Sequence, residues 1–370
     1  MTKSEKIRVA LLFGGQSAEH EISILSARNV LAALDRARFE PILIGIDKAG
    51  RWLAQDPQKL LASEADPRLV RVQPGLPVQL SASPAAPTQN PAVGQIDVAF
   101  PIMHGTLGED GAIQGLLEVA GIPYVGAGVL GSAIGMDKDV MKRLLREAGI
   151  PVTRFLTVRD RDVLADPEKA TRDIAALGFP LFTKPANAGS SVGVRKVARA
   201  ADLPDALRHA FQFDRKILAE AAVIGREIEL AVLGGDPPSV SVAGEIVVQH
   251  PDGFYSYDAK YLDEHGAKLE APARMSAAEL ARAQELALRA FQVLECEGMA
   301  RVDLFLQPDG ALLVNEINTI PGFTAISMYP RLWAVSGVSP TELVSRLIDL
   351  ALERGRKRLA VRRSLSADQA

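Results

Sequence analysis

The sequence predicts a mixed fold, partly α/β and partly α+β, that begins with a doubly wound parallel sheet. In the first third of the chain, apolar strand-like runs alternate with a run of helical spacing, which is the order that produces parallel sheets. The chain has 370 residues, 48% of them hydrophobic and 24% charged, with a formal net charge of -3. These are the proportions of a globular protein, and a chain of this length ordinarily divides into two or three domains.

The N-terminal domain is expected to span residues 1–135 and to contain most of the parallel sheet. Its regular elements are predicted in this order: a strand at 7–13, a helix at 21–34, a strand at 41–47, a strand at 97–102 and a helix over 113–121. Residues 54–91 are rich in Pro, Ala, Ser and Gln. We therefore expect an irregular surface insertion there, which adds little to the core.

Two further domains and a tail are expected: a central domain over 136–223, a C-terminal domain over 224–356 and a basic tail over 357–370. The central domain starts with the amphipathic run MDKDVMKRLLREAG, which Gly149 and Pro151 stop. It continues as a small α+β unit with the apolar run FPLFTKP. The C-terminal domain alternates strands with one long helix near 276–295.

Composition excludes several classes of protein. The single cysteine, Cys296, has no partner for an intrachain disulfide or a cysteine metal cluster, which favours the reducing cytoplasm. The first apolar run ends at Gly14 without a cleavage pattern, so we predict a buried strand and not a signal peptide. No window approaches the roughly 20 apolar residues that span a bilayer. Charges are mixed outside the tail, so neither nucleic acid nor a membrane is an expected partner.

The segment RVDLFLQPDGALLVNEIN predicts a hairpin that pairs two carboxylates. Asp309-Gly310 suits a two-residue type I′ turn between two apolar strands. With that turn, paired positions sum to 619, so Asp303 lies opposite Glu316 and Arg301 lies opposite Asn318. All four then share one face of the hairpin, because positions two apart on a strand point the same way.

Facing carboxylates repel each other and need a compensating positive charge. Mg²⁺ prefers a few carboxylate and amide oxygens together with phosphate oxygens and water, and Asp303, Glu316 and Asn318 offer such a set. A hairpin in which Arg301 neutralises both acids is an equally good interpretation of this segment alone.

A second segment, FTKPANAGSSVGV, places Lys184 at the end of an apolar strand, before a run of small residues. Small residues let backbone N–H groups approach a phosphate closely, and the ammonium adds attraction. The order differs from that of a P-loop, and a turn without ligand is the better explanation of the segment taken alone. Glu220 and Glu227, near a following strand, could hydrogen-bond an adenine amino group and ribose hydroxyls.

Together these segments resemble the ATP-grasp superfamily, and more closely its D-alanine:D-alanine ligase family. The match runs from Ile7 to about Ala351 in the family's order. It is carried by the motifs LLFGGQSAEHEIS, PIMHGTLGEDGAIQGLLE, GIPYVGAG, MDKDVMK, TKPANAGSSVG, YDAKY, RVDLF and VNEINTIPGFTAISM. The resemblance implies an ATP-grasp fold behind an N-terminal pre-ATP-grasp domain, and ATP bound between the central and C-terminal domains.

The resemblance also implies a role for each residue of the site. The nucleotide would be bound by Lys138 and Lys184 at its phosphates, Ser191 in the loop, Glu220 at adenine with backbone contacts from Ala221 to Val223, and Glu227 at ribose. Two Mg²⁺ ions, with Mn²⁺ as a substitute, would be held by Asp303, Glu316 and Asn318. The two D-alanine substrates would be handled by Glu19, Ser190, Tyr261, His104, Arg301, Gly322, Ser327, Met328 and Lys260.

Within that set, Glu19 would anchor the ammonium of the first D-alanine. It would also link with Ser190 and Tyr261, so that residues 251–266 close as a lid over the site. Arg301 and the Gly322 N–H would form an oxyanion site. Members of the family are usually dimers, so a homodimer is expected.

Three other functions deserve comparison. In a D-alanine:D-lactate ligase the lid tyrosine is often replaced, so Tyr261 favours the dipeptide. A nucleotide-binding module without turnover would not need the oxyanion donor Arg301. A dinucleotide oxidoreductase is disfavoured, because no GxGxxG follows the first strand.

Overall fold

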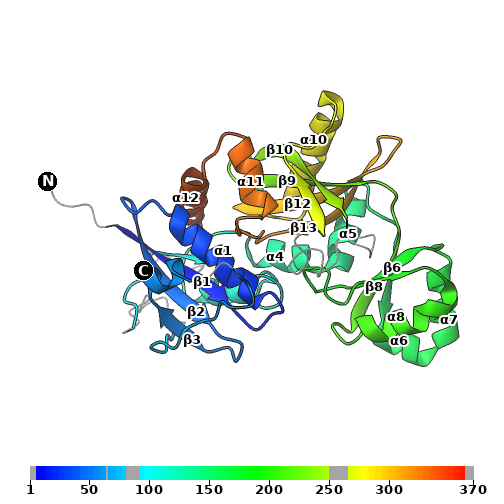
Figure 1. The fold of residues 1–370 in the computed structure, drawn as a ribbon, viewed down its shortest axis with the longest axis horizontal. Helices are drawn as coiled ribbons and strands as arrows, with labels where there is room; N and C mark the ends of the chain where they lie inside the picture. The colour runs from blue at the N-terminus through cyan, green and yellow to red at the C-terminus, as the bar shows by residue number, and fades with distance from the viewer. Residues whose placement is uncertain (1–5, 64–65, 81–91, 250–265, 363–370) are drawn as a thin grey trace.

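The computed structural model describes residues 6–63, 66–80, 92–249 and 266–362. Three sheets, each with its own helices, make up this part of the chain (Figure 1). Along the chain they form an α/β unit first and two antiparallel units after it.

The first sheet has the strand order β3-β2-β1-β4. Its strands are β1 (Ile7–Gly14), β2 (Phe39–Ile46), β3 (Trp52–Gln55) and β4 (Val98–Pro101). The first, second and fourth are parallel, whereas β3 is an antiparallel edge strand. Alternate residues of β1 enter two different cores, one with α1 (His20–Ala33) and one with α3 (Ala112–Val119). Both faces are therefore covered, and the predicted doubly wound sheet is confirmed.

The expectation for residues 54–91 is wrong where the structure describes them. This stretch includes the end of β3 and the short helix α2 (Pro57–Leu61), which Asp56 caps. Leu60, Val70 and Val78 are all buried in the cores on the two faces of the first sheet. A polar composition concealed these contributions, because single apolar residues spaced far apart give no periodic pattern.

The central unit is an antiparallel sheet of order β5-β8-β6-β7. Its strands are β5 (Phe155–Arg159), β6 (Leu181–Pro185), β7 (Arg195–Val197) and β8 (Lys216–Ala221). Its helices are α6 (Asp160–Ala165), α7 (Pro167–Ala175) and α8 (Leu203–Ala210), with a 3-10 turn at Ala200–Asp202. A small separate core fills this unit. It forms its own lobe, at the lower right of Figure 1.

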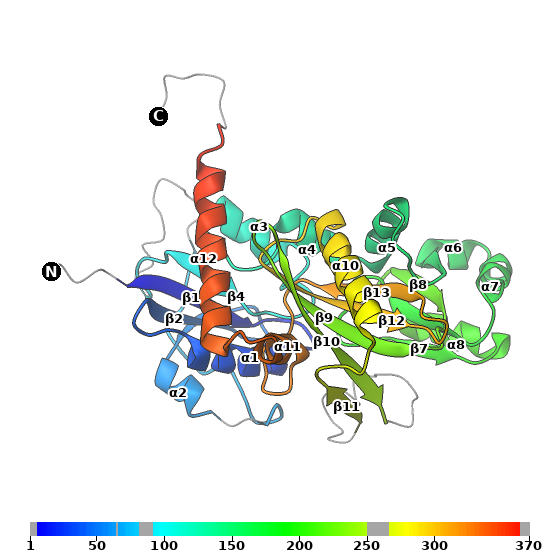
Figure 2. The same ribbon diagram turned by 90° about the horizontal axis from the view of Figure 1, so that it is seen from above.

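The third sheet, of order β11-β10-β9-β12-β13, is entirely antiparallel. Its strands are β9 (Arg226–Leu233), β10 (Ser239–Val248), β11 (Ala267–Glu270), β12 (Met299–Leu306) and β13 (Leu312–Asn318). Helix α10 (Ala277–Val293) covers one face and begins with a capping box between Ser276 and Glu279. Helix α11 (Met328–Val335) packs from the other face (Figure 2).

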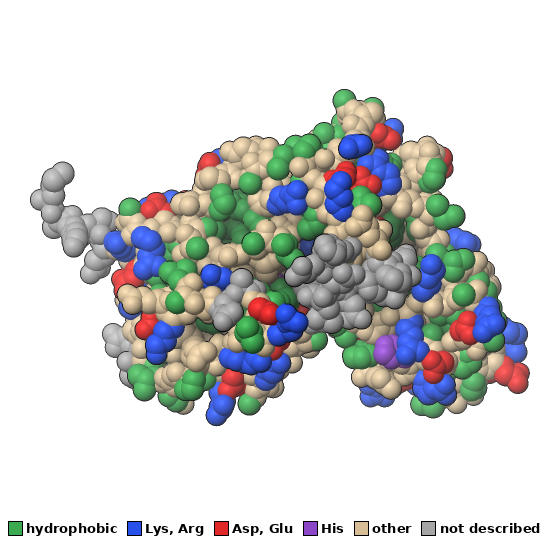
Figure 3. Space-filling view, viewed as in Figure 1, with side chains coloured by type: hydrophobic (Ala, Val, Ile, Leu, Met, Phe, Trp, Pro, Cys, Tyr) green, Lys and Arg blue, Asp and Glu red, His purple; other side chains and the backbone are tan. Residues whose placement is uncertain are grey.

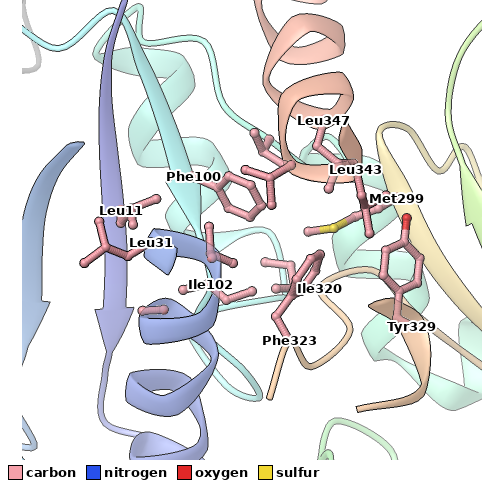
Figure 4. Packing of buried hydrophobic residues seen from close by; sticks show 14 of the residues in the cluster. Leu11, Leu31, Phe100, Ile102, Met299, Ile320, Phe323, Tyr329, Leu343 and Leu347 are labelled. Atoms are coloured by element: carbon pink, nitrogen blue, oxygen red, sulfur yellow. The ribbon is translucent and has the colours of Figure 1, made fainter. Parts of the chain in front are cut away.

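The last helix joins the C-terminal unit to the first sheet. Helix α12 (Pro340–Leu359) buries Leu343 and Leu347 in a core that also contains Leu11, Phe100 and Phe323 (Figure 4). Charged contacts reinforce this packing: Asp349 of α12 pairs with Arg38 at 2.6 Å, and Arg354 and Arg358 of α12 contact Tyr124 and Glu118. The helices α4 (Val129–Met136) and α5 (Lys138–Glu147) connect the first sheet to the central unit.

The β12–β13 hairpin pairs the residues that were predicted, although its turn is different. Asp303 lies opposite Glu316 and Arg301 lies opposite Asn318. The turn is longer than two residues: the Gln307 N–H donates to Ala311, and Gly310 adopts a φ of +83. Beyond it, Leu306 pairs with Leu312, so positions sum to 618 until a bulge adds one residue on β13. That extra residue, Asn315, restores the predicted register at the carboxylates.

Candidate active site

Two adjoining cavities lie where the three units meet. The larger, of about 440 Å³, lies between the central and C-terminal sheets. The smaller, of about 100 Å³, is lined by residues of the N-terminal unit and of the segment that follows β13. Ser190, Arg301 and Glu316 line both cavities. A ligand in one cavity would therefore reach the same side chains as a ligand in the other.

The larger cavity gathers every residue predicted to bind the nucleotide. Its lining includes Lys138, Lys184, Ser191, Glu220, Ala221, Val223 and Glu227. These positions come from the start of α5, from β6 and its following loop, and from β8 and β9. Residues distant in the sequence thus converge on one concave surface, which has the size expected of a small-molecule site.

The loop after β6 connects the two cavities. Ser190 and Ser191 both have left-handed backbone conformations, with φ of 49 and 58. The Ser190 hydroxyl donates a hydrogen bond to Glu19, which is the contact that the family resemblance implied. Gly189, directly before Ser190, lies so close to Glu19 that an added Cβ would be 2.6 Å from a Glu19 carboxylate oxygen. A larger residue here would displace the Glu19 carboxylate, so the small-residue run has a steric cause as well as a predicted binding role.

A buried group of charges lies beneath the larger cavity. The Glu220 carboxylate is 2.7 Å from Lys184 Nζ and 3.3 Å from Lys142 Nζ. Burial acts to raise the pKa of Glu220, but the two lysines outweigh it and hold that pKa at about 2. Although burial opposes it, the charge of Glu220 raises the pKa of Lys184. Lys138 is 3.4 Å from Glu316 and donates to the Ala188 carbonyl at 2.8 Å.

Three acidic residues form one row across the C-terminal sheet. Asp303 on β12 pairs in register with Glu229 on β9 and with Glu316 on β13. Arg301 donates two hydrogen bonds of 2.7 Å to Asp303, and its Nε is 3.3 Å from Glu229. These carboxylates raise the pKa of Arg301 well above its usual value, despite its burial. The guanidinium therefore stays charged and holds the acids in fixed positions.

The three predicted metal ligands, Asp303, Glu316 and Asn318, lie together on the β12–β13 hairpin. The Asn318 amide nitrogen Nδ2 donates to Asp303 at 3.1 Å, so the amide oxygen of Asn318 takes no part in this hydrogen bond. The Asp303 and Glu316 side chains keep 13% and 23% of their surface exposed. Two carboxylates and an amide oxygen at a cavity wall suit Mg²⁺, which retains water and phosphate oxygens as further ligands. Within the described residues no group of three or more His, Cys, Asp or Glu side chains is arranged to hold a metal.

The smaller cavity gathers the residues predicted to handle the amino acids. Its lining includes Glu19, His104, Ser190, Arg301, Gly322, Ser327 and Met328. Glu19 lies directly before α1, on the loop after β1, where parallel α/β sheets present their ligand-binding groups. An added Cβ at Gly322 would lie 2.7 Å from Ser327 Oγ, so the backbone passes that hydroxyl closely.

His104 joins the first sheet to the segment after β13. Its Nδ1 lies 3.0 Å from the Ile320 carbonyl, which can only accept, so Nδ1 carries the proton. Its Nε2 then accepts from the Ser26 hydroxyl at 3.0 Å, and that hydroxyl accepts from the Phe323 N–H. Burial lowers the pKa of His104, which favours this neutral form.

Four residues near the cavities were not predicted. Glu229 and Asn315 line the larger cavity, and Glu109 lines the smaller one. Burial and the nearby Glu19 charge raise the pKa of Glu109 to about 8, while its carboxylate accepts the Gly105 N–H at 2.8 Å. The fourth, Lys142, lies behind Glu220.

The sequence held one signal for these residues: Glu229 lies two positions after Glu227 in an apolar strand, so both point to the same face. Lys260, Tyr261 and the predicted lid lie outside the described residues.

Comparison with known proteins decides the family. Residues 8–127 match the family model described as D-ala D-ala ligase N-terminus, and residues 144–349 match D-ala D-ala ligase C-terminus. The chain belongs to the D-alanine:D-alanine ligase family. A relative named D-alanine--D-alanine ligase A, from Chromobacterium violaceum, is 53% identical over 97% of this chain and 99% of its own length. A second, named D-alanine--D-alanine ligase, from Oceanobacillus iheyensis, is 48% identical over 95% and 97%.

Solved structures of family members share the fold. The structure of the D-alanine-D-alanine ligase from Coxiella burnetii has a TM-score of 0.84 and 39% identity, and the match covers 96% of this chain and 97% of that one. The VanG D-Ala:D-Ser ligase from Enterococcus faecalis has a TM-score of 0.82 and 36% identity, with 94% and 100% covered. The predicted ATP-grasp fold is thereby confirmed, because the chain superimposes over nearly its whole length on two ligases of this family.

The surface contains charges of both signs. Lys and Arg side chains are interspersed with Asp and Glu over the face shown in Figure 3, so this face has no broad region of one charge. Among the described residues, every helix is too short or too polar to traverse a bilayer.

Proposed function

We propose that this protein uses ATP to ligate two D-alanine molecules into D-alanyl-D-alanine through a D-alanyl phosphate intermediate. One observation carries the proposal: the cavity lined by the nucleotide residues and the cavity lined by the amino-acid residues share Ser190, Arg301 and Glu316. A phosphoryl group in the first therefore meets a carboxylate in the second, which is the proximity that phosphoryl transfer requires. The names of the relatives at 48–53% identity support the same activity.

In the first step, a carboxylate oxygen of the first D-alanine attacks the γ-phosphorus of ATP, and ADP leaves. Lys138 and Lys184, both in the larger cavity, offset the charge of the phosphates. Asp303, Glu316 and Asn318 would hold two Mg²⁺ ions, with Mn²⁺ as a substitute. When bound, these ions neutralise charge on the transferring phosphoryl group.

In the second step, the free amine of the second D-alanine attacks the carbonyl carbon of the acyl phosphate. Arg301 and the Gly322 N–H stabilise the tetrahedral oxyanion. Phosphate departs with the oxygen that came from the carboxylate, and the new amide nitrogen loses a proton. Ser327 and Met328, in the lining of the smaller cavity, contact the carboxylate of the second D-alanine.

The remaining predicted residues bind and enclose the substrates. Glu19, buried and hydrogen-bonded to Ser190, anchors the ammonium of the first D-alanine, near His104. The other contacts of the nucleotide are made by Ser191, Glu220, Ala221, Val223 and Glu227. Because acyl phosphates hydrolyse readily, water must be excluded, and Lys260 and Tyr261 belong to the lid that performs this role.

The product is a precursor for peptidoglycan synthesis, and we place the reaction in the cytoplasm, where ATP is supplied. The lone Cys296 is buried, and burial raises the pKa of its thiol, which suits a protein without disulfides. A homodimer is proposed from the family resemblance.

Phosphate release tests the proposed function when D-alanine, L-alanine, D-lactate and D-serine are offered separately and in pairs with D-alanine. We expect release with D-alanine alone, together with one dipeptide per phosphate. D-serine is included because the chain is similar to a D-Ala:D-Ser ligase. A preference for D-lactate or D-serine as the second substrate at neutral pH would reassign the product. ATP binding without any release would leave a non-catalytic nucleotide-binding module.

A further inference from the structure

A buried lysine behind the larger cavity has no role in the reaction described above. Lys142, on α5, has a relative exposure of 0% and does not belong to the residues that line either cavity. Its ammonium donates to the Thr153 hydroxyl at 2.8 Å and lies 3.3 Å from Glu220. A lysine is almost never fully buried unless it is paired, and these two contacts supply the pairing. What they do not explain is why a charged residue occupies this buried position.

The two lysines hold different oxygens of the same carboxylate. Lys184 contacts Glu220 Oε2, and Lys142 is nearest to Oε1. Lys184 lines the larger cavity, but Lys142 does not, so any effect of Lys142 on a ligand must pass through Glu220. Burial lowers the pKa of Lys142, and the Glu220 carboxylate opposes that change.

The charges of this group explain why a second lysine is needed. Lys184 and Glu220 alone would form a closed ion pair with no net charge toward a phosphate. Two lysines and one carboxylate together keep one positive charge. A partly dry cavity strengthens such a charge, because the effective dielectric constant there is lower than in water.

We infer that Lys142 is a positioning residue for ATP: it holds one oxygen of Glu220 and offsets its charge, so that Lys184, paired with the other oxygen, still presents a net positive charge to the phosphates. The inference rests on the proposed function only in that the larger cavity binds ATP. The alternative is a purely structural pair that secures α5 against Thr153.

The test compares Lys142→Met with Glu220→Gln and with the double variant. Lys142→Met should raise the KM for ATP about tenfold, while the KM for D-alanine stays within about twofold, because the lost attraction acts on phosphates alone. In the Glu220→Gln background, the same substitution should change ATP affinity by less than about threefold, since Lys142 acts through a carboxylate that is absent there. Arg143→Met is the control: the side chain of this neighbour on α5 is exposed, pairs with the buried Asp139 and lines neither cavity, so both KM values should stay unchanged.

Calorimetry with ATP alone, without D-alanine, separates this inference from the proposed function. Wild-type protein that binds ATP but releases no phosphate would refute the ligase activity and leave the role of Lys142 intact. An ATP affinity that is unchanged in Lys142→Met, or that falls about tenfold from Glu220→Gln to the double variant, would overturn the inference. If Lys142→Met does not fold, the comparison of Glu220→Gln with the double variant decides, and a tenfold difference between these two contradicts it.

Discussion

Replacing Asp303 with asparagine separates its structural role from its catalytic one. The carboxylate accepts two hydrogen bonds from Arg301, both 2.7 Å long, and one from Asn318 at 3.1 Å. An asparagine keeps one accepting oxygen, but its NH₂ group faces donors at the other position. Asp303→Asn therefore loses up to two of these hydrogen bonds.

The stability cost follows from these contacts. A hydrogen bond to a charged group contributes about 1.5–3 kcal/mol, and the Arg301 and Asp303 side chains are only 18% and 13% exposed, so solvent weakens the pair modestly. We expect a loss of about 2–4 kcal/mol in the free energy of unfolding, with the fold retained. Turnover should fall further, by about 100- to 1000-fold, because a proposed metal ligand is lost as well.

A matched control distinguishes the two effects. Asp139 is similarly buried and accepts from Arg143 and Thr157, but it does not belong to the residues that line the two cavities. Asp139→Asn should lose comparable stability and keep turnover within about threefold. Urea unfolding and phosphate release over a range of Mg²⁺ concentrations measure both. If Asp303→Asn retained near wild-type turnover at ordinary Mg²⁺, Asp303 would not belong to the metal site.

The other predictions concern the smaller cavity and the core. Glu19→Gln should raise the KM for the first D-alanine by about 100-fold or more, with little change for ATP, because it removes a buried carboxylate that we propose pairs with the substrate ammonium; an unchanged KM would reassign the cavity. The pKa of Glu109 is raised to about 8, so its stabilising contribution is complete below about pH 4.5 and disappears as the pH rises through 8. As the pH rises from about 4.5 to 8, the free energy of unfolding of Glu109→Gln should therefore increase relative to that of wild type, as measured by urea unfolding. A difference between the two proteins that stays constant over this pH range would contradict the raised pKa. Leu347→Ala should cost about 2–5 kcal/mol of unfolding free energy, since this residue of α12 is fully buried; a cost near zero would show that α12 does not belong to the core.

Local patterns predicted the elements that carry the site, and longer-range features explain the errors. The strand period placed Asp303 and Glu316 opposite each other, as observed. The prediction assumed a two-residue turn, and the longer turn should have displaced the pair by one residue. The bulge at Asn315 compensated for this, and nothing in the local sequence predicts a bulge.

Contacts between distant segments could not be predicted from sequence patterns. Glu229 joins the acidic row because β9 lies beside β12, although the described residues between these two strands also form β10, β11 and α10. The contacts between Glu220, Lys184 and Lys142 depend on how α5 packs behind β8. Periodicity assigns a residue to a face of its own element, whereas its partner depends on how the elements pack.

The most direct test follows the oxygen of the substrate carboxylate. D-alanine labelled with ¹⁸O in both carboxylate positions is incubated with ATP, Mg²⁺ and the protein, and the released phosphate is analysed by mass spectrometry. Transfer through D-alanyl phosphate predicts one labelled oxygen in each phosphate. Phosphate without label would contradict the account, because its fourth oxygen would then have come from water.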